Sequence, residues 1–564
     1  MASKDLGEPH EASRVLRRID RASGSLPYSH PMPASSSQPT VAIVGGGLAG
    51  LAAACALADS GFRVTLFEKR PFLGGRASSY QHPGTGEVVD NCQHVLFRLC
   101  TNLIEFYTRI GAAGQIRWFD QMNFIEPGGR ISALKSSPLP APLHTAPAFF
   151  AFPFLSLADK LAIARALVPL TLTAPRDTGE TFQHWLDRHG QTRNAVARFW
   201  QPILVSALSE DLDRISVPAA AQVVRESMKS LPARHMGVPT VPLTDLYTAA
   251  GDYIRARGGV LHFRQPVDGF AADSSHVHLE ARNQAEDDQN KNQQDSVAPS
   301  LSRSLPQAGD RNEGGERDAP RLADFAGRGN LDFDYLVLAL PFDALDRVLP
   351  DAPESSPLRE QISHFENSPI TGIHLWFDRQ ISDLDHAVLL DRTIQWMFHK
   401  SNLQPMRAQA ANAREGHDFR HAERERKENR ALAPEAGSYI ELVVSSSKTL
   451  IDKSRSEIVD LALAEVREFF PAAREANLLK STVIKELNAT YSPRPGIDAH
   501  RPASATAWPR VFLAGDWTAT GWPATMEGAV RSGYLAAEAI LRAADRPARF
   551  ISPDLPATGL MRLF

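Results

Sequence analysis

A glycine pattern near the start of the chain restricts the folds open to it more than any other feature does. Gly45, Gly47 and Gly50 spell G-x-G-x-x-G between the apolar run Val41–Val44 and the Ala-rich segment LAAACALADSG. A buried parallel strand appears in sequence as such an apolar run, and the Ala-rich segment is typical of a helix that ends at a glycine. The stretch FRVTLFEK follows as a second strand. The residues therefore predict one βαβ unit.

This unit is typical of a dinucleotide site. The glycines permit a tight turn and let the backbone approach a pyrophosphate, while the N-terminus of the helix, at Leu48 and Ala49, offers amide donors and a positive dipole. Glu68, followed by Lys69, lies 18 residues after Gly50, near the position where an acid binds a ribose hydroxyl. A Gly-rich turn that binds nothing is the alternative, but the strand, the helix and the acid together favour a dinucleotide.

Composition narrows the class of protein further. The 564 residues, 43% of them hydrophobic, can bury a large core and predict roughly two to four domains. A formal net charge of −4 and the lack of a basic stripe argue against a nucleic-acid partner. Cys55, Cys92 and Cys100 show no disulfide or zinc spacing, so we expect no metal and a reducing, cytoplasmic compartment.

Three polar segments and one apolar segment interrupt the pattern of a folded core. Residues 1–37, 282–330 and 405–436 are predicted to be disordered, because they cannot bury enough apolar surface, although 405–436 could also form a solvated helix. No apolar run reaches the ~18 residues that span a bilayer. Ala146–Leu172 comes nearest, and Pro153 with several charges breaks it. It predicts either a core helix pair or a segment that contacts a membrane surface or a lipid.

Several further strands are predicted from their sequence patterns. GGVLHF, which ends at Phe263, and FDYLVLALP, which ends at Pro341, predict buried strands. GIHLWF and SYIELVVS alternate more, as antiparallel strands do. Near the end of the chain, RVFLAGDW predicts a strand and MEGAVRSGYLAAEAILRA a helix.

Two motifs favour a flavin over a nicotinamide. GGRASSY contains Gly74, Gly75 and Arg76, and LAGDWTATGWPATMEGAV contains Gly515 and Asp516. Both resemble motifs of a large flavoprotein group that includes the amine oxidases and the carotenoid desaturases. The resemblance implies an α/β fold: a Rossmann-like, amine oxidase-like FAD-binding domain with an inserted α+β substrate domain.

The same resemblance implies roles for single residues. Arg76 would pair with pyrophosphate oxygens, and Asp516 would bind the ribityl or phosphate region of FAD. Val267 would offer backbone contacts to adenine. The helix that starts at Met526, Glu527, Gly528 and Ala529 would point its N-terminus at the flavin N1–C2=O edge, where its dipole favours the negative charge of a reduced flavin.

The order of the motifs predicts the domain boundaries. Residues 38–113, 240–345 and 500–545 would form the FAD-binding domain, and residues 114–239 and 346–499 the substrate domain. Residues 546–564 would be a C-terminal tail.

The stretch DNCQHVLF, which contains Asp90, Cys92 and His94, raises a separate question. A metal is not expected there, because no second pair of ligands with a zinc-like spacing follows. A packed Cys92 is favoured over a nucleophile. The stretch resembles the D-N-G-Q-H-V-L-x signature of the squalene-associated flavin desaturases, or hydroxysqualene dehydroxylases, and AGDWTATGWPATMEGAVRSG resembles their C-terminal signature. Cys92 replaces the usual Gly and Arg98 stands in a usually small or apolar neighbourhood, and both would reshape the substrate pocket.

This resemblance implies an FAD-dependent reduction of hydroxysqualene to squalene for hopanoid biosynthesis in bacteria. The hydroxyl is allylic, so its protonation and loss as water leave a delocalised cation that can accept a hydride. The protein must supply a proton donor and exclude water. Asp90 and His94 are the candidates for donating the proton or orienting the hydroxyl, and a purely structural Asp–Asn turn is the alternative. A reductant of unknown identity would reduce the flavin.

The substrate, an isoprenoid lipid, would lie against residues 138–175 and Phe199–Leu208, and contact with the inner face of the cell membrane would supply it. Three rivals stay open. An oxidative carotenoid or phytoene-type desaturase would share the fold and a similar substrate. An amine oxidase is disfavoured by the absence of a Cys near the C-terminal motif. A prenyl-chain carrier without catalysis is disfavoured because the cofactor motifs are retained.

Overall fold

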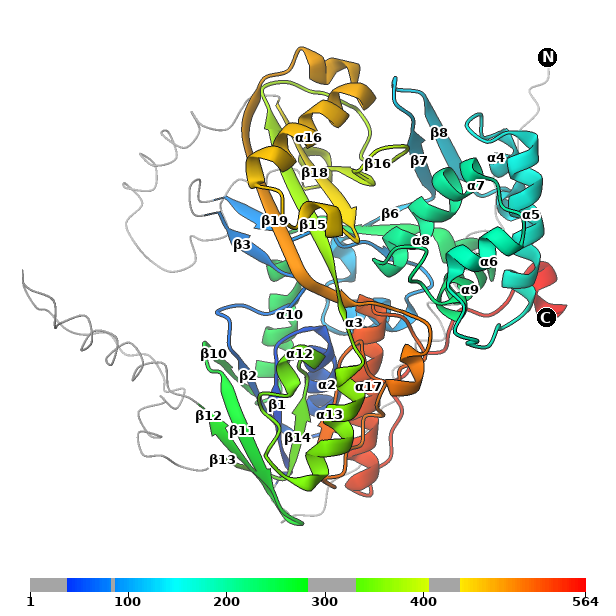
Figure 1. Cartoon of the computed structure of the whole chain (residues 1–564). Helices are drawn as coiled ribbons and strands as arrows, with labels where there is room; N and C mark the ends of the chain where they lie inside the picture. Colours follow the sequence, from blue (N-terminus) through cyan, green and yellow to red (C-terminus); the bar gives the residue numbers. More distant parts are fainter. Residues whose placement is uncertain (1–37, 83–86, 282–330, 405–436, 564) are drawn as a thin grey trace, which may run out of the picture. The chain divides into compact units, whose positions relative to one another are not determined.

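The computed structural model describes residues 38–82, 87–281, 331–404 and 437–563 (Figure 1). The predictions of disorder for residues 1–37, 282–330 and 405–436 therefore lie outside the described residues.

A parallel sheet forms the base of the predicted dinucleotide fold. Its strands are β1 (Thr40–Val44), β2 (Arg63–Glu68), β10 (Val260–Phe263), β14 (Tyr335–Leu338) and β20 (Val511–Leu513). Their order is β10-β2-β1-β14-β20, and every neighbouring pair is parallel. Strands β1, β14 and β20 are almost entirely buried, as their continuous apolar runs predict. Strand β10 lies at the edge of the sheet and is only partly buried, so the prediction of a buried strand at GGVLHF was wrong. The predicted α/β fold class is confirmed.

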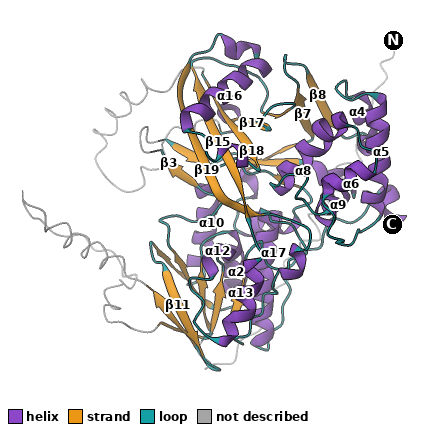
Figure 2. Cartoon of the chain, in the orientation of Figure 1, coloured by secondary structure: helices purple, strands orange, loops and turns teal. Residues whose placement is uncertain are grey.

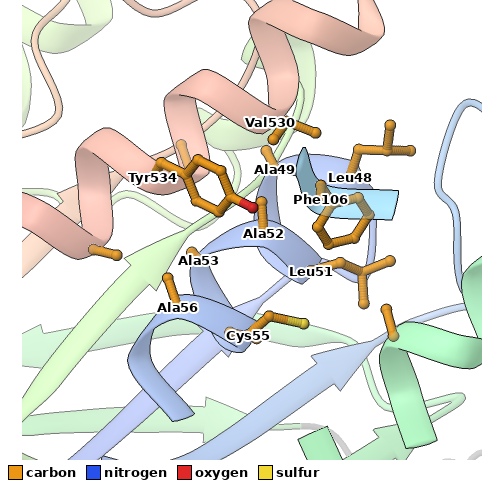
Figure 3. Close-up of a cluster of buried hydrophobic side chains, with 14 of the residues drawn as sticks. Leu48, Ala49, Leu51, Ala52, Ala53, Cys55, Ala56, Phe106, Val530 and Tyr534 are labelled. Carbon is orange, nitrogen blue, oxygen red and sulfur yellow. The ribbon is translucent and has the colours of Figure 1, made fainter. Parts of the chain in front are cut away.

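The Ala-rich helix α2 (Leu48–Asp59) packs closely against α17 (Met526–Ala543), the helix predicted near the C-terminus. Figure 3 shows Val530 and Tyr534 of α17 and Phe106 of α3 (Thr101–Arg109) around the small side chains of α2. The approach is close because a Cβ on Gly533 would lie 2.2 Å from the carbonyl oxygen of Ala49. Alanine and glycine are therefore needed here to bring the two ends of the chain together.

A second, seven-stranded sheet has the order β19-β15-β18-β17-β16-β7-β8 (Figure 2). Its strands are β7 (Gln121–Ile125), β8 (Ile131–Lys135), β15 (Asn367–Phe377), β16 (His386–Leu389), β17 (Trp396–His399), β18 (Ser438–Ser445) and β19 (Leu478–Tyr491). The two segments predicted as antiparallel strands pair with each other, Gly372 opposite Val443. Helix α16 (Arg455–Phe469) follows β18 in the chain and contacts β19.

The apolar segment Ala146–Leu172, predicted to be either a core helix pair or a membrane- or lipid-contacting segment, forms α4 (Ala146–Ala151) and α5 (Leu157–Leu172). One face of α5 buries Ile163, Ala166 and Leu170 in a core shared with α6 (Phe182–Arg188), α8 (Gln201–Leu208) and α9 (Val217–Met228). The described part of the chain contains no helix long and apolar enough to cross a membrane.

Shorter elements complete the described chain. They are β3 (Ser79–Gln81), β4 (Val88–Asp90), β5 (Leu96–Phe97), β6 (Ile116–Phe119), β9 (Met236–Pro239), α10 (Leu243–Arg255), β11 (Val267–Ala272), β12 (Val277–Ala281), β13 (Leu331–Phe333), α12 (Phe342–Leu345), α13 (Ser356–Ser363) and α14 (Lys400–Leu403). The parallel sheet draws its strands from the ranges assigned to the FAD-binding domain and the seven-stranded sheet from those assigned to the substrate domain. The division into two domains itself stays a prediction.

Candidate functional site

A cavity of about 470 Å³ opens at the carboxyl ends of the parallel strands. Its wall includes Val44 at the end of β1, Glu68 at the end of β2, Ala339 just after β14 and Gly515 just after β20. Open parallel sheets bind their ligands at this edge, where neighbouring strands continue on opposite sides. The blue and red segments of Figure 1 thus contribute to one site from the two ends of the chain.

The glycine-rich loop has the shape that a pyrophosphate requires. Gly45 has a φ of +110°, and a Cβ there would lie 2.4 Å from the carbonyl oxygen of Ala339. A Cβ on Gly50 would lie 2.0 Å from the carbonyl oxygen of Gly45, so this third glycine allows the helix to start close to the strand. Helix α2 has no side-chain cap and no acid in its first turn. Its first amides are therefore available to a bound anion.

The GGR motif lies directly against this loop. The amide of Gly74 donates to the carbonyl of Gly46 at 2.9 Å, and a Cβ on Gly75 would lie 2.9 Å from the Cα of Gly47. The sequence suggested a role for Arg76 but not this packing of glycine on glycine. The two loops together form a wall on which only backbone can approach a ligand.

Arg76 and Asp516, predicted to contact FAD separately, form an ion pair of 2.5 Å and both line the cavity. The pair joins parts of the chain that lie 440 residues apart. Glu68 also has partners already. Its carboxylate accepts from the amides of Gly46 at 2.7 Å and Arg70 at 2.8 Å, which fixes its orientation toward the loop. Each carboxylate oxygen keeps a second lone pair for a ribose hydroxyl.

Most predicted cofactor residues line the cavity. They are Gly45, Gly47, Leu48, Ala49, Glu68, Lys69, Gly74, Gly75, Arg76, Val267, Gly515, Asp516, Met526 and Ala529. The individual contacts to FAD stay predictions. Gly50 does not line the cavity; it lets helix α2 start close to the carbonyl of Gly45.

Two residues at the start of α17 do not line the cavity. Glu527 is fully buried and accepts hydrogen bonds from the amides of Asn102 and Leu103 and from Arg531. It caps the N-terminus of α3 and joins that helix to α17, so its side chain is engaged away from the cavity, and its predicted contact with the cofactor stays a prediction. The amide of Gly528 donates to Oγ1 of Thr525 and closes the N-cap of α17 instead.

Asp90 also lies outside the cavity wall. Its Oδ1 accepts from the hydroxyl of Ser79 at 2.6 Å and the amide of Leu243 at 3.1 Å, and its Oδ2 lies 2.7 Å from the ammonium of Lys400. Burial alone would raise the pKa of Asp90, but Lys400 and these hydrogen bonds hold the pKa below its ordinary value. Asp90 is therefore held as a carboxylate outside the cavity wall, and its predicted part in donating the proton or orienting the hydroxyl stays a prediction.

His94 does line the cavity. Its Nε2 is enclosed and has no hydrogen-bond partner among the described residues. Burial lowers the pKa of His94 to about 4, so the imidazole is neutral at neutral pH and carries one donor and one acceptor nitrogen. Burial raises the pKa of the nearby Cys92 thiol well above its ordinary value. This agrees with the prediction that Cys92 packs rather than reacts.

Beyond the glycine loops the cavity reaches the second sheet. Ser206, Ala207 and Ser209, in and just after α8, line it together with Ile370 of β15 and with Ala489 and Thr490 of β19. The prediction of a substrate wall at Phe199–Leu208 thus coincides with cavity residues, whereas residues 138–175 contribute none.

Sequence reasoning missed the segment that follows β14. This segment supplies Leu340, Pro341, Ala344, Arg347 and Val348 to the wall. The signal was present, because FDYLVLALP was recognised as a buried strand, and the residues after such a strand face the ligand edge of the sheet.

Comparisons with known proteins agree with this geometry. The family described as flavin containing amine oxidoreductase matches residues 311–541, and the NAD(P)-binding Rossmann-like domain matches residues 43–110. The 15-cis-phytoene desaturase of Synechococcus elongatus is 26% identical over 90% of this chain and 96% of its own length. The probable zeta-carotene desaturase of the same organism is 27% identical over 89% and 98%. The structure of cyclohexylamine oxidase from Brevibacterium oxydans has a TM-score of 0.56 at 16% identity and covers 90% of this chain and all of its own.

The chain is therefore a flavin-dependent oxidoreductase, and it is similar in sequence to the flavin containing amine oxidoreductases and to the carotenoid desaturases. Its cofactor is FAD. The uncapped helix, the glycine loops and the oriented Glu68 fit that cofactor.

Proposed function

We propose that this protein reduces hydroxysqualene to squalene, a reductive dehydroxylation that serves hopanoid biosynthesis. The observation that carries the proposal is the neutral His94 on the cavity wall, with an enclosed Nε2 that has no partner among the described residues. An unpaired buried nitrogen is costly unless a ligand satisfies it. A hydroxyl group would do so. The likeness of DNCQHVLF to the hydroxysqualene dehydroxylase signature is the second support.

The residues of the chain would divide the work. The glycine loops, Glu68 and Arg76 hold the cofactor, and the apolar side chains of the wall exclude water from the reacting carbon. His94, with its neutral imidazole, would orient the hydroxyl through a hydrogen bond to Nε2. Bound FAD, brought to its dihydro form by a reductant of unknown identity, would supply both the hydride that replaces the hydroxyl and the proton with which the hydroxyl leaves as water.

Oxidative carotenoid desaturation is the second candidate, because the relatives compared above are named as desaturases of phytoene and zeta-carotene. Those hydrocarbons offer no group that would satisfy the Nε2 of His94, which favours an alcohol. Amine oxidation is less favoured, because the solved amine oxidases are under 25% identical and show the fold alone. A carrier without catalysis has no need of the complete glycine loops.

An apolar face on α5 suggests how a lipid substrate arrives. Leu157, Leu161 and Val168 are 67%, 53% and 56% exposed, and their spacing places them on one side of the helix with Leu172. Apolar stripes of this kind mark protein or membrane contacts. The exposed Arg165 lies within the same stripe and suits anionic headgroups. A cytoplasmic protein that contacts the inner face of the cell membrane is therefore part of the proposal.

One product assay tests the reaction. The purified FAD-loaded protein is reduced with dithionite under anaerobic conditions and given hydroxysqualene, and in parallel the oxidised protein is given phytoene. Squalene from the first mixture supports the proposal. A desaturated product from phytoene, with no squalene from hydroxysqualene, overturns it in favour of the desaturase.

A further inference from the structure

Behind the cavity wall lies a buried charged cluster for which neither the sequence nor the proposed chemistry accounts. The ammonium of Lys400 in α14 lies 2.7 Å from Asp90, 2.9 Å from Oε1 of Gln93 and 3.2 Å from Glu441 of β18. The side chains of Lys400, Asp90 and Glu441 are all at most 2% exposed. Two of the three ammonium donors form hydrogen bonds, to Asp90 and Gln93, and Glu441 is an ion-pair partner at 3.2 Å.

We infer that Lys400 is a positioning residue, which holds the Asp90–His94 turn so that His94 faces the FAD cavity. The inference rests on the proposed role of His94. Lys400 contacts two residues of the turn: its ammonium pairs with the carboxylate of Asp90 and donates to Oε1 of Gln93. The side-chain Nε2 of Gln93 in turn donates to the backbone carbonyl of His94 at 3.1 Å. Two hydrogen bonds in series thus connect Lys400, through the Gln93 side chain, to the backbone of His94.

The opposite side of the turn is fixed as tightly. The side-chain amide of Asn91 donates to the carbonyl of Arg76 at 2.8 Å and to Glu486 of β19 at 3.2 Å. A Cβ on Gly372 of β15 would lie 2.8 Å from the carbonyl oxygen of Asn91, so the strand presses on the turn. Arg76 and β15 hold one side of the turn, and Ser79 and Leu243 hold Asp90, so Lys400 is the group that fixes the Gln93 side chain.

A buried ion pair can be a poor stabiliser and still select one conformation. Apolar side chains of equal volume would fill the space around Lys400 without fixing which way Gln93 and His94 point. A group near a reacting atom that moves by about 1 Å can cost about 100-fold in rate. Lys400 therefore acts on catalysis through His94, without touching the cavity.

The test compares Lys400→Met with the double variant Lys400→Met/Asp90→Asn. The single variant leaves two buried carboxylates without a cation and risks failing to fold. In the double variant Glu441 is the one acid left in the cluster, and it can be neutral by taking up a proton. Lys229→Met, which removes a partly buried lysine paired with Glu226, is the matched control.

Three measurements on the FAD-loaded proteins follow. We expect FAD affinity within threefold of wild type by fluorescence titration in all variants. Hydrogen exchange of the peptide that spans residues 88–97 should be at least tenfold faster in the Lys400 variants and unchanged in the control. Turnover should fall about 100-fold in kcat with KM within threefold.

The outcomes separate the two ideas. Unchanged exchange of residues 88–97 in the folded double variant overturns the inference, and so does faster exchange with full turnover. Faster exchange throughout the protein, in α5 as well as in residues 88–97, or loss of FAD binding also overturns it, because the role would then be general stabilisation. If the wild type makes no squalene, the proposed function fails, while localised exchange still supports Lys400 as the residue that holds the turn.

Discussion

Replacing Glu441 by Gln should change how the stability of this protein depends on pH. Glu441 is fully buried, and neither carboxylate oxygen forms a hydrogen bond in the described structure, although Lys400 lies 3.2 Å away. Burial raises the pKa of Glu441 from 4.5 to about 7, against the opposing effect of Lys400. The other groups that act on it are the Asp90 carboxylate and the amide of Gln93. Above neutral pH, two carboxylates therefore share one ammonium.

The size of the effect follows from the shift. A raised pKa means that the folded chain holds a proton which the unfolded chain releases, so the contribution is fully present below pH 4.5 and is lost as the pH rises through about 7. At about 1.4 kcal/mol per unit, the loss between pH 5 and pH 8.5 is about 2.5 kcal/mol. The unfolding entropy of a chain this long is about 1 kcal/mol/K, which converts the loss to about 2–3 °C in Tm.

Differential scanning calorimetry at pH 5 and pH 8.5, with FAD in excess, measures the difference. Glutamine mimics the protonated acid and cannot ionise, so the Tm of Glu441→Gln relative to wild type should rise by about 2–3 °C from the lower to the higher pH. Glu465→Gln is the control: this buried acid accepts from the amides of Thr393 and Ile394, and its replacement should bring no gain at high pH. A Tm difference for Glu441→Gln that stays constant or shrinks with rising pH refutes the reasoning.

Three further outcomes are expected. Gly50→Ala places a Cβ about 2.0 Å from a backbone carbonyl and should weaken FAD binding at least 100-fold by fluorescence titration, so unchanged affinity would contradict the role given to the loop. His94→Ala should keep FAD affinity within threefold and lose about 100-fold or more in kcat in the squalene assay, whereas normal turnover removes it from the mechanism. Leu157→Asp/Leu161→Asp should at least halve sedimentation with anionic vesicles, and Leu479→Asp, equally exposed on β19, should not.

The parts of the site that sequence predicts well are those built by residues close together in the chain. Gly45 and Gly50 are recognisable because one turn between a strand and a helix must meet a phosphate, and the spacing is local. Glu68 follows from the length of one helix and one strand. The alternating strand that contains Gly372 and the buried strand before Pro341 follow in the same way from side-chain burial, which sets a period that can be read directly.

The position of Glu527 on α17 could have been predicted from helical periodicity. The start of α17 was correctly expected beside the cofactor, and Met526 and Ala529, three residues apart, share the helix face that lines the cavity. Glu527 lies one step further around the helix and meets α3 instead. Helical periodicity separates these faces, so the side chains of four consecutive residues cannot all lie on one surface.

Lys400 and Glu441 could not be predicted at all. Lys400 reaches Asp90 across 310 residues of sequence and carries no motif, and it precedes a charged segment that suggested only solvent. A lysine and a glutamate in isolation are ordinarily surface residues. Both residues are buried because β17 pairs with β18, with Phe398 opposite Glu441. This pairing brings both charged groups close to the Asp90–His94 turn.

The different fates of Asp90 and His94 bear on the kind of substrate the cavity accepts. Four residues apart, both could have faced the cavity, and a carboxylate there would have repelled both an apolar chain and the negative charge of a reduced flavin. Instead Asp90 is neutralised by Lys400 behind the wall, and the turn presents a neutral imidazole. At this turn the cavity therefore meets one neutral, weakly polar nitrogen and no carboxylate, which supports the proposed substrate, a long hydrocarbon with a single hydroxyl, over an amine, whose positive charge a carboxylate would attract.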